Sequence, residues 1–333
     1  MRLSGITNPT TLVACYCQTM LVRLLCMAGT SLLAVVGASA QTYPNKPIRI
    51  VTNEVGGGAD FVSRLIAQGL TVSLGQQVIV DNRGNIAGEL AAKATPDAYT
   101  LLLNGGTLWL MPFLRDNMSY DPVKDLSPIS LTSMIPTVLV VHPSVAANSV
   151  KELIALARAN PGKLNYGSGS SSAPTHLAAE LFKSMANLNI VRIPFRGSGP
   201  ALNGLIGGEV QMMFPNAAAA QPHIKSGRLK ALAVASSQPS ALAPGLPTVA
   251  ATVPGFESAS LMGMFAPART PAKLVQFLNQ EIVRVLNRAE VRQKLFAAGV
   301  DSVGTTPEQF AVTIKSEMAR LGKVIRDGGI RAE

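Results

Sequence analysis

Short apolar runs alternate along this chain with longer stretches in which apolar positions recur about every 3.6 residues. Runs of this length, bounded by turn residues, are typical of buried strands, and the longer stretches are typical of amphipathic helices. We expect strands at residues 48–52, 77–81, 100–104, 137–141, 164–167, 190–195, 210–214 and 229–235. The alternation of strands with helices predicts an α/β fold with largely parallel sheets.

Several of the expected helices carry clear start signals. Ser149-Val150-Lys151-Glu152 has the form of a capping box, and Asn160-Pro161-Gly162 would end that helix. Thr270-Pro271 and Thr306-Pro307 each place a threonine cap before a proline at the first helical position. The two helices that follow them, near 273–287 and 308–329, show the helical period clearly.

Two extended segments, 137–143 and 260–267, would cross between domains. A middle block, 141–259, would then form one lobe, while 41–140 and 260–333 together would form the other. The resulting expectation is a two-domain protein with a ligand cleft between its lobes and a hinge beside the cleft.

The beginning of the chain has the pattern of an export signal. One arginine and an apolar core precede Ala38-Ser39-Ala40, which has the form of a signal-peptidase site. We expect residues 1–40 to be a signal peptide that is cleaved after Ala40, and the mature protein to be periplasmic. The residues before Met20 are superfluous to such a signal, so translation could start at Met1 or at Met20.

All three cysteines, Cys15, Cys17 and Cys26, precede the expected cleavage point. A lipoprotein signal is the rival interpretation, but Cys26 lies before the apolar core and not at its end. The mature chain would therefore contain no cysteine, and neither a disulfide nor thiol chemistry is expected.

The chain is basic, with 29 Lys and Arg against 19 Asp and Glu and a formal net charge of +10. Arg2 and Arg23 would leave with the signal peptide, which reduces the basic residues to 27 and the net charge to +8. The basic residues are scattered and aromatic residues make up only 5% of the chain, so a nucleic-acid-binding surface is not indicated. The positive balance favours small anionic ligands instead.

Three consecutive glycines, Gly56-Gly57-Gly58, join the first expected strand to an amphipathic helix. Such a turn leaves unpaired N–H groups at the positive end of the helix dipole, which is an anion site. The spacing is not GxGxxG and no Lys-Ser/Thr follows, so a nucleotide is disfavoured. A tight turn whose glycines only relieve crowding is the alternative.

Four further loops share a small, hydroxylated, glycine-rich composition and lead into helix starts: 104–107, 166–172, 195–200 and 214–217. Ligands of open α/β sheets bind beyond the carboxyl ends of the strands, where these loops should gather. Backbone N–H groups, serine hydroxyls and one arginine would suit a carboxylate. Any single loop could still be only a structural turn.

The sequence carries no recognisable signature of an enzyme or of a metal site. His142, His176 and His223 lack metal-ligand spacing, and neither a G-x-S-x-G nor an H-E-x-x-H motif occurs. A pair formed by Ser168 and His176 leaves a serine hydrolase as an alternative. We otherwise expect no catalysis, no metal and no cofactor.

Eleven stretches in order resemble the solute receptors of tripartite tricarboxylate transporters, also called Bug-type receptors. They are YPNKPIRI, GGGADFVSRLIAQGL, GQQVIVDNR, TPDAYTLLL, YDPVKDLSPIS, VKELIALARANPGKLNYGS, HLAAELFKSMA, IPFRGSGPALNGLIGGEVQMMF, HIKSGRLKALAV, LPTVA and FAPARTP. The resemblance covers about Tyr43 to Ile330. It implies a periplasmic receptor that closes on a small carboxylate and delivers it to a membrane permease with one large and one small subunit. We expect a monomer that binds without chemistry.

The resemblance also implies which residues would bind the ligand. In one lobe they would be Gly57, Gly58, Asp60 and Thr107, and in the other Ser168, Ser170, Arg196, Gly197 and Asn216. Asp60 would orient the loop and ordered water, because a carboxylate placed directly against a carboxylate ligand is repelled.

Departures from the family pattern leave the ligand open. Family members usually carry apolar residues and proline where this chain has Asn53-Glu54-Val55, and Pro215 replaces an acid. Glu54 would oppose a tricarboxylate and could meet an amine, or it could face solvent. A monocarboxylate, an amino acid, an aromatic acid or an amide would all remain possible ligands. A sensor that presents the closed receptor to a membrane kinase is the alternative output.

Overall fold

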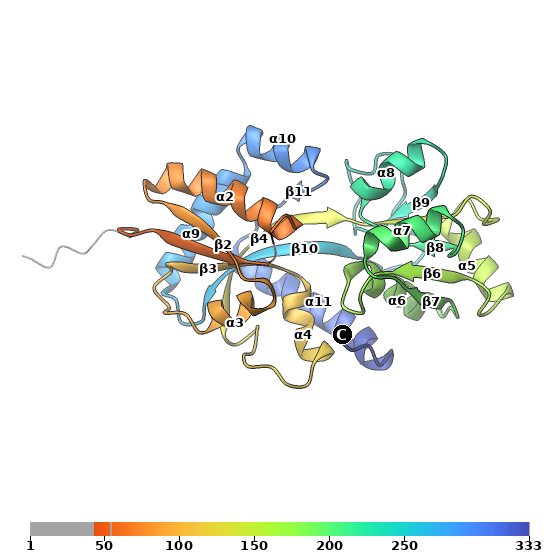
Figure 1. Ribbon diagram of the computed structural model, residues 1–333, viewed down its shortest axis with the longest axis horizontal. Helices are drawn as coiled ribbons and strands as arrows, with labels where there is room; N and C mark the ends of the chain where they lie inside the picture. The colour runs from red at the N-terminus through yellow and green to blue at the C-terminus, as the bar shows by residue number, and fades with distance from the viewer. Residues whose placement is uncertain (1–42, 54, 333) are drawn as a thin grey trace, which may run out of the picture. The chain divides into compact units, whose positions relative to one another are not determined.

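The protein is built on two β-sheets with helices packed against them, as the computed structural model shows (Figure 1). The structure describes residues 43–53 and 55–332. The expected signal peptide, its cleavage point and Glu54 lie outside the described residues. From Lys46 onward the described residues belong to one compact unit.

The first sheet contains six strands, and we call this sheet with its helices the first lobe. Its strands are β1 (Ile48–Thr52), β2 (Val78–Asn82), β3 (Thr100–Gly105), β4 (Leu126–Pro136), β10 (Ala259–Pro267) and β11 (Asp301–Ser302). Their order across the sheet is β11-β4-β10-β3-β1-β2. The helices of this part of the chain are α2 (Gly58–Leu74), η1 (Gly84–Ile86), α3 (Ala87–Ala92), α4 (Thr107–Leu114), α9 (Ala272–Leu286), α10 (Ala289–Ala297) and α11 (Pro307–Asp327).

The second sheet contains five strands, and with its helices it forms the second lobe. Its strands are β5 (Val138–Val141), β6 (Asn165–Ser168), β7 (Val191–Pro194), β8 (Met212–Met213) and β9 (Lys230–Val234). Their order is β7-β6-β8-β5-β9. The helices between and after these strands are α5 (Val150–Ala159), α6 (Pro174–Ala186), α7 (Ser198–Ile206), α8 (Ala217–Lys225) and the short η2 (Val249–Ala251). The predicted α/β class and two-lobed architecture are confirmed.

The strand directions are more mixed than the sequence predicted. β1 is parallel to β2 and β3, and β6 is parallel to β7 and β8. However, β10 is antiparallel to both β3 and β4, and β5 is antiparallel to β8 and β9. For β4 and β10 the reason is that the chain leaves the first sheet along β4 and returns along β10. These two neighbouring strands therefore run in opposite directions.

β4 was not predicted as a strand, because its sequence LSPISLTSMIP is rich in serine, threonine and proline. Two of its buried hydroxyl groups nevertheless find partners in the fold. Ser130 Oγ donates to the carbonyl of Thr305 at 2.8 Å, and Thr132 Oγ1 donates to the carbonyl of Met262 at 2.9 Å. Small hydroxylated residues can therefore fill the interior where a backbone carbonyl lies within hydrogen-bonding reach.

Most of the expected helix caps occur where the sequence placed them. The capping box of Thr306 and Gln309 starts α11, with Pro307 in the first turn. At α5, Ser149 Oγ accepts a hydrogen bond from the backbone N–H of Glu152, as expected. The Glu152 carboxylate accepts from the backbone N–H of Asn148, one residue before the cap. Thr270 is not the cap of α9, because Pro271 holds that position and the Thr270 hydroxyl donates to the carbonyl of Pro267 at 2.7 Å.

The chain passes between the two sheets at two points that lie side by side. Thr137 follows β4, Ser258 precedes β10, and Thr137 Oγ1 donates to the carbonyl of Ser258 at 3.2 Å. The backbone of Ala235 bonds to both segments, accepting from Ser258 and donating to Thr137. The lobe boundaries predicted from the sequence, 41–140 with 260–333 and 141–259, stay predictions.

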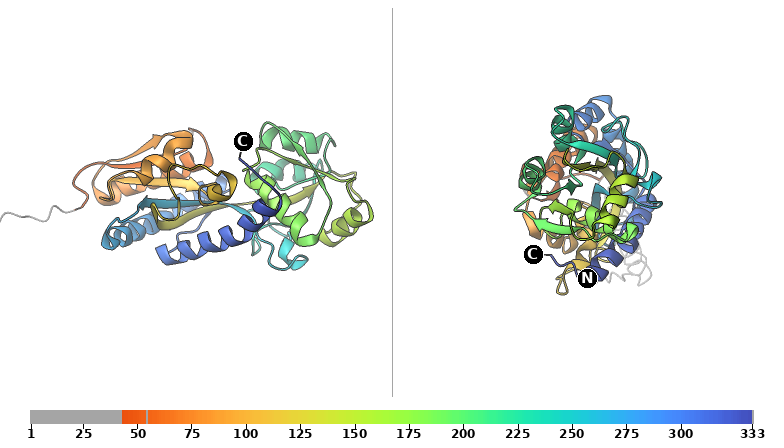
Figure 2. Two further views of the ribbon diagram at one scale, coloured as in Figure 1. Left: turned by 90° about the horizontal axis from the view of Figure 1, so that it is seen from below. Right: turned by 90° about the vertical axis from the view of Figure 1, so that its right-hand side faces the viewer.

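Helix α11 extends from the first sheet toward the second lobe, where it packs on α6 (Figure 2). An aromatic cluster fixes it on the first sheet. The rings of Phe310 and Phe265 lie 5.1 Å apart and those of Phe310 and Trp109 lie 5.7 Å apart, between centroids. Because Trp109 belongs to α4, this cluster also positions the start of α4. Among the described residues, no helix has the length and apolar character needed to cross a bilayer.

The aromatic cluster leaves no room for a side chain at Gly263 of β10. A β-carbon added there would lie 2.0 Å from Cζ of the fully buried Phe310 ring. We expect Gly263→Ala to lower the free energy of unfolding by about 1–3 kcal/mol, because the ring and α11 must move. Urea denaturation measures this. Gly199→Ala is the control, since nothing lies within 4 Å of its added β-carbon. Equal stability losses in the two variants would contradict the packing argument.

Candidate functional site

Two adjoining cavities lie where the two lobes meet. The polar cavity has a volume of about 260 Å³, and the apolar cavity has a volume of about 200 Å³. Asn53 and Thr107 line both, so the cavities adjoin at these two residues. Each cavity also receives residues from both lobes, which is the arrangement expected of a cleft that closes on a ligand.

The polar cavity is lined mainly by amides, hydroxyls and one guanidinium. Its polar side chains include Asn85, Asn104, Arg115 and Tyr120 from the first lobe and Ser170 and Ser172 from the second. Burial, and then the nearby Glu89, raise the pKa of Tyr120, so its hydroxyl stays protonated and can donate a hydrogen bond at neutral pH. Arg115 follows the last residue of α4 and adds a positive charge to this lining.

A direct contact joins the lobes at the polar cavity. Thr107 Oγ1 donates to the carbonyl of Ser172 across the lobes, at 3.4 Å. The loop before Thr107 is held by Asn104, whose side-chain oxygen accepts from Asn53 at 3.1 Å and from the N–H of Gly105 at 2.7 Å. The start of α4 is thus tied to the turn after β1.

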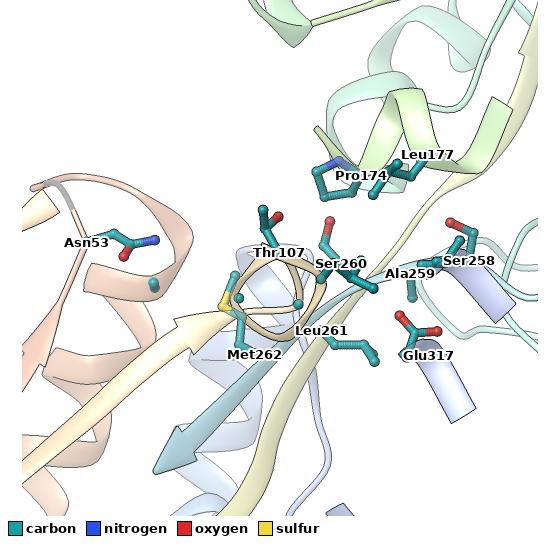
Figure 3. A pocket seen from close by; sticks show the side chains of 15 residues that line it. Asn53, Thr107, Pro174, Leu177, Ser258, Ala259, Ser260, Leu261, Met262 and Glu317 are labelled. Atoms are coloured by element: carbon teal, nitrogen blue, oxygen red, sulfur yellow. The ribbon is translucent and has the colours of Figure 1, made fainter. Parts of the chain in front are cut away.

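The apolar cavity lies beside the crossing strand β10. Apolar side chains from four elements line it: Leu110, Leu177, Leu261, Met262 and Leu321. Figure 3 shows Pro174 and Leu177 of α6 above the cavity, opposite Ala259, Ser260 and Leu261. It also shows a single carboxylate, that of Glu317 on α11, at the edge near Ser258 and Ala259.

Asp60, predicted near the ligand, is buried within its own lobe. Its carboxylate accepts from the N–H of Gly56 and from the amide of Asn82, both at 3.0 Å, and pairs with Arg64 at 2.9 Å. Burial is the largest influence and raises the pKa, but the hydrogen bonds from Arg64, Gly56 and Asn82 together hold the pKa of Asp60 below its usual value. Asp60 therefore holds the glycine turn in shape.

The glycine turn at residues 56–58 lies next to residues that line the apolar cavity. Gly57 is the N-cap of α2 and Gly58 is its first residue. A β-carbon at Gly58 would lie 2.7 Å from Cε of Met262, which lines the apolar cavity together with Ala59. Glycine at position 58 thus allows the start of α2 to approach the cavity wall closely.

In the second lobe, the predicted residues divide into two groups. Ser170 is exposed and lines the polar cavity, close to Thr107. Ser168 is fully buried, and its hydroxyl accepts from Nε of Arg192 at 2.9 Å. Among the described residues, Arg196, Gly197 and Asn216 line neither cavity. The loop at Gly197 lies against Gly169, and Asn216 is the N-cap of α8 and forms a β-bridge with Thr137.

Arg192, which the sequence interpretation missed, organises the serine-rich loop. Besides Ser168, its guanidinium donates to the carbonyl of Gly169 at 2.8 Å and to Ser171 Oγ at 3.4 Å. The only sequence signal is a charged residue within a short strand that runs beside β6. Because three groups of the loop meet one rigid guanidinium, the loop that carries Ser170 is preorganised.

A buried polar cluster supports the other side of this loop. The Tyr166 hydroxyl donates to Glu180 and lies 2.8 Å from Nδ1 of His176, and Lys183 pairs with Glu180 at 2.7 Å. Burial and then Glu180 raise the pKa of Tyr166, which keeps its hydroxyl protonated. The hydroxyl of Ser168 and the Nδ1 atom of His176 thus have different partners, Arg192 and Tyr166.

Within residues 43–53 and 55–332, no group of three or more His, Cys, Asp or Glu residues could hold a metal ion.

Comparisons with known proteins agree on one family. The family model described as "Tripartite tricarboxylate transporter family receptor" matches residues 62–330. Protein BugT of Bordetella pertussis is 36% identical over 325 residues, covering 91% of this chain and 98% of BugT.

Two solved structures extend this similarity to the fold. "R. palustris Rpa4515 with adipate" is 33% identical with a TM-score of 0.70, covering 87% of this chain and 99% of that one. MatC from Rhodopseudomonas palustris with bound malate is 26% identical with a TM-score of 0.66, covering 85% of this chain and 100% of that one.

The lowered pKa of Asp60 generates a prediction about stability and pH. The carboxylate contributes stability above its unfolded pKa of about 3.9, and this contribution is lost as the pH falls through the lower folded pKa. We expect Asp60→Asn to lower the free energy of unfolding by about 1–3 kcal/mol at neutral pH. The reason is that the ion pair with Arg64 and the hydrogen bond from the N–H of Gly56 are weakened. The difference from the unchanged protein should shrink below about pH 4.

Thermal or urea unfolding between neutral pH and about pH 3 measures this difference. Asp116→Asn is the matched control, since the Asp116 side chain is 79% exposed and pairs only at the surface with Arg331. A stability difference for Asp60→Asn that stays constant to the lowest pH would contradict the assigned role.

The contacts of Arg192 generate a second prediction. Lysine keeps the charge but cannot reach three loop groups at once, so we expect Arg192→Lys to loosen the serine loop. The backbone N–H of Ala173 bonds to Ser170 and that of Phe195 bonds to Ser168. Both should exchange with solvent deuterium about tenfold faster, since losing hydrogen bonds to a charged group costs about 1.5–3 kcal/mol. Unchanged exchange, equal to that in an Arg228→Lys control, would contradict this role.

Proposed function

Because the chain belongs to the family of tripartite tricarboxylate transporter receptors, we propose that it captures a small carboxylate between its lobes and presents it to membrane permease subunits. The carrying observation is the polar cavity, which joins Arg115, Thr107 and Ser170 from both lobes. Related receptors bind adipate and malate, which are both carboxylates.

The polar lining suits a carboxylate. Arg115 would provide a charge-assisted hydrogen bond, and the hydroxyls of Thr107 and Ser170 would donate to the remaining oxygen positions. The start of α4 adds the positive end of a helix dipole next to Thr107. Gly57, Gly58, Asp60, Ser168, Arg196, Gly197 and Asn216 would serve the site by shaping the loops around it, or by reaching the ligand when the lobes close.

Closure follows from where the ligand binds. A ligand that contacts both lobes binds the closed form better than the open form, and so it shifts the population toward closure. The paired crossings at Thr137 and Ser258 would be the hinge. The lobes on either side would be 41–140 with 260–333, and 141–259.

Family members are periplasmic binding proteins, and we propose that this chain reaches the periplasm by its signal peptide, with cleavage after Ala40. We further propose that it acts as a monomer and without catalysis. The contacts of Ser168 with Arg192 and of His176 with Tyr166 weigh against the serine hydrolase alternative. The alternative output, a sensor that presents the closed receptor to a membrane kinase, would use the same capture of the ligand between the lobes.

The proposal is tested by isothermal titration calorimetry of the mature protein with a panel of small mono-, di- and tricarboxylates. We expect at least one to bind saturably without being turned over. Arg115→Gln should weaken its binding by about ten- to a hundredfold, because a charged hydrogen bond is worth about 1.5–3 kcal/mol.

Arg228→Gln is the control, since Arg228 is exposed on the second lobe and lines neither cavity. Equal binding by Arg115→Gln and the control would contradict the assigned site. Saturable binding of no carboxylate would contradict the receptor proposal, and product formation that Ser168→Ala abolishes would favour the hydrolase.

A further inference from the structure

The carboxylate of Glu317 is an unusual component of the apolar cavity. Glu317 is only 7% exposed, and its neighbours in the lining are mostly apolar. Figure 3 shows its carboxylate directed toward Ala259 and Ser258, on the cavity side of α11. A buried acid at a cavity wall needs either a proton or partners, and one of those partners can be a ligand.

Arg320 does not fully neutralise this acid. One of its guanidinium nitrogens donates to Oε1 of Glu317, while another lies 3.2 Å from Oε2 of Glu257. One positive charge is thus shared between two carboxylates, and the cluster carries a net negative charge when both are ionised. Burial has the strongest influence on the pKa of Glu317 and raises it. Arg320 lowers this pKa and Glu257 raises it, and the net effect of all three is a rise.

The two adjoining cavities therefore differ in the sign of their charged side chain as well as in polarity. Arg115 supplies a positive charge to the polar cavity, whereas Glu317 supplies an acidic group to the apolar one. The shared residues Asn53 and Thr107 mark the junction between them. A ligand that fills both would have an anionic end, an apolar middle and a second end that meets a hydrogen-bond acceptor.

We propose, on the basis of the proposed carboxylate receptor function, that the ligand is an ω-hydroxy or ω-amino acid whose donor group meets Glu317. Its carboxylate occupies the polar cavity and its methylene chain lies along Leu177, Leu261 and Leu321. A hydroxyl or an ammonium satisfies the Glu317 carboxylate, and an ammonium also balances the charge shared with Glu257 and Arg320.

A second carboxylate at the far end is disfavoured for the same reason. It would lie against Glu317 in a cavity with a mostly apolar lining, where like charges repel strongly. A plain alkanoate is disfavoured less strongly, because it buries its chain but leaves the acceptor without a donor. At one chain length, the identity of the far end decides affinity.

Calorimetry with four acids of one chain length tests this on the full mature protein: hexanoate, ω-hydroxyhexanoate, ω-aminohexanoate and adipate. We expect the hydroxy or amino acid to bind about tenfold or more tightly than hexanoate and adipate. A shorter set built on butanoate should keep the ranking while losing roughly three- to fourfold in affinity for each buried methylene removed.

Glu317→Gln separates charge from shape. It keeps an acceptor oxygen but removes the negative charge, so adipate should gain affinity and the amino acid should lose it. Glu308→Gln is the matched control, since Glu308 is an exposed acid on the same helix and does not line the cavity. It should leave the ranking of the four acids unchanged.

Adipate binding to the unchanged protein as tightly as the donor-bearing acids would overturn this inference and leave the receptor proposal standing. The same ranking in Glu317→Gln as in the unchanged protein would also overturn it. Failure of every carboxylate in the wider panel would instead contradict the receptor proposal itself. The unchanged protein alone decides the first outcome, so the test does not depend on the variants folding.

Discussion

The antiparallel pairing of β4 with β10 is the constraint on which the rest of the structure depends. The register runs from Ala259 opposite Pro136 to Pro267 opposite Leu126, with two irregularities. Because backbone groups of a buried strand must be paired, this ladder fixes where the chain leaves the first sheet and where it returns. The exits at Thr137 and Ser258 are therefore neighbours, and Ser258 lines the apolar cavity.

This arrangement separates a rigid framework from the part that would move. The framework includes the aromatic cluster of Trp109, Phe265 and Phe310, which holds α4 and α11 against the first sheet. In the second lobe, Arg192 and the Tyr166 cluster hold the serine loop from two sides. Loops on fixed supports can meet a ligand with little loss of conformational entropy, which is the usual basis of preorganised binding.

The sequence predicted what depends on local pattern. β1 occurs at its predicted bounds because Ile48, Ile50 and Val51 form a short apolar stretch. The start of α11 follows from Thr306 and Pro307. β4 was missed because buried hydroxyls such as those of Ser130 and Thr132 find their partners only in the folded chain. Thr107 and Ser170, predicted from the family resemblance and their glycine-rich loops, both line the polar cavity.

The remaining site residues could not be found from the sequence alone. Arg115 follows the end of α4, Arg192 sits in a short strand, and Glu317 lies on an amphipathic helix that has many charged positions. Each resembles an ordinary surface residue in sequence, and only tertiary packing brings it to a cavity or a loop. Asp60 was predicted from the resemblance to orient the glycine loop, and its partners Gly56, Asn82 and Arg64 are known only from the folded chain.

A crystal structure of the mature protein with a bound carboxylate tests the central claim most directly, namely that the ligand is held between the two lobes. We expect the carboxylate within hydrogen-bonding distance, about 2.7–3.2 Å, of Arg115, Thr107 or Ser170, with contacts from both lobes. A ligand that contacts one lobe alone, or that lies outside the two adjoining cavities, would contradict the account.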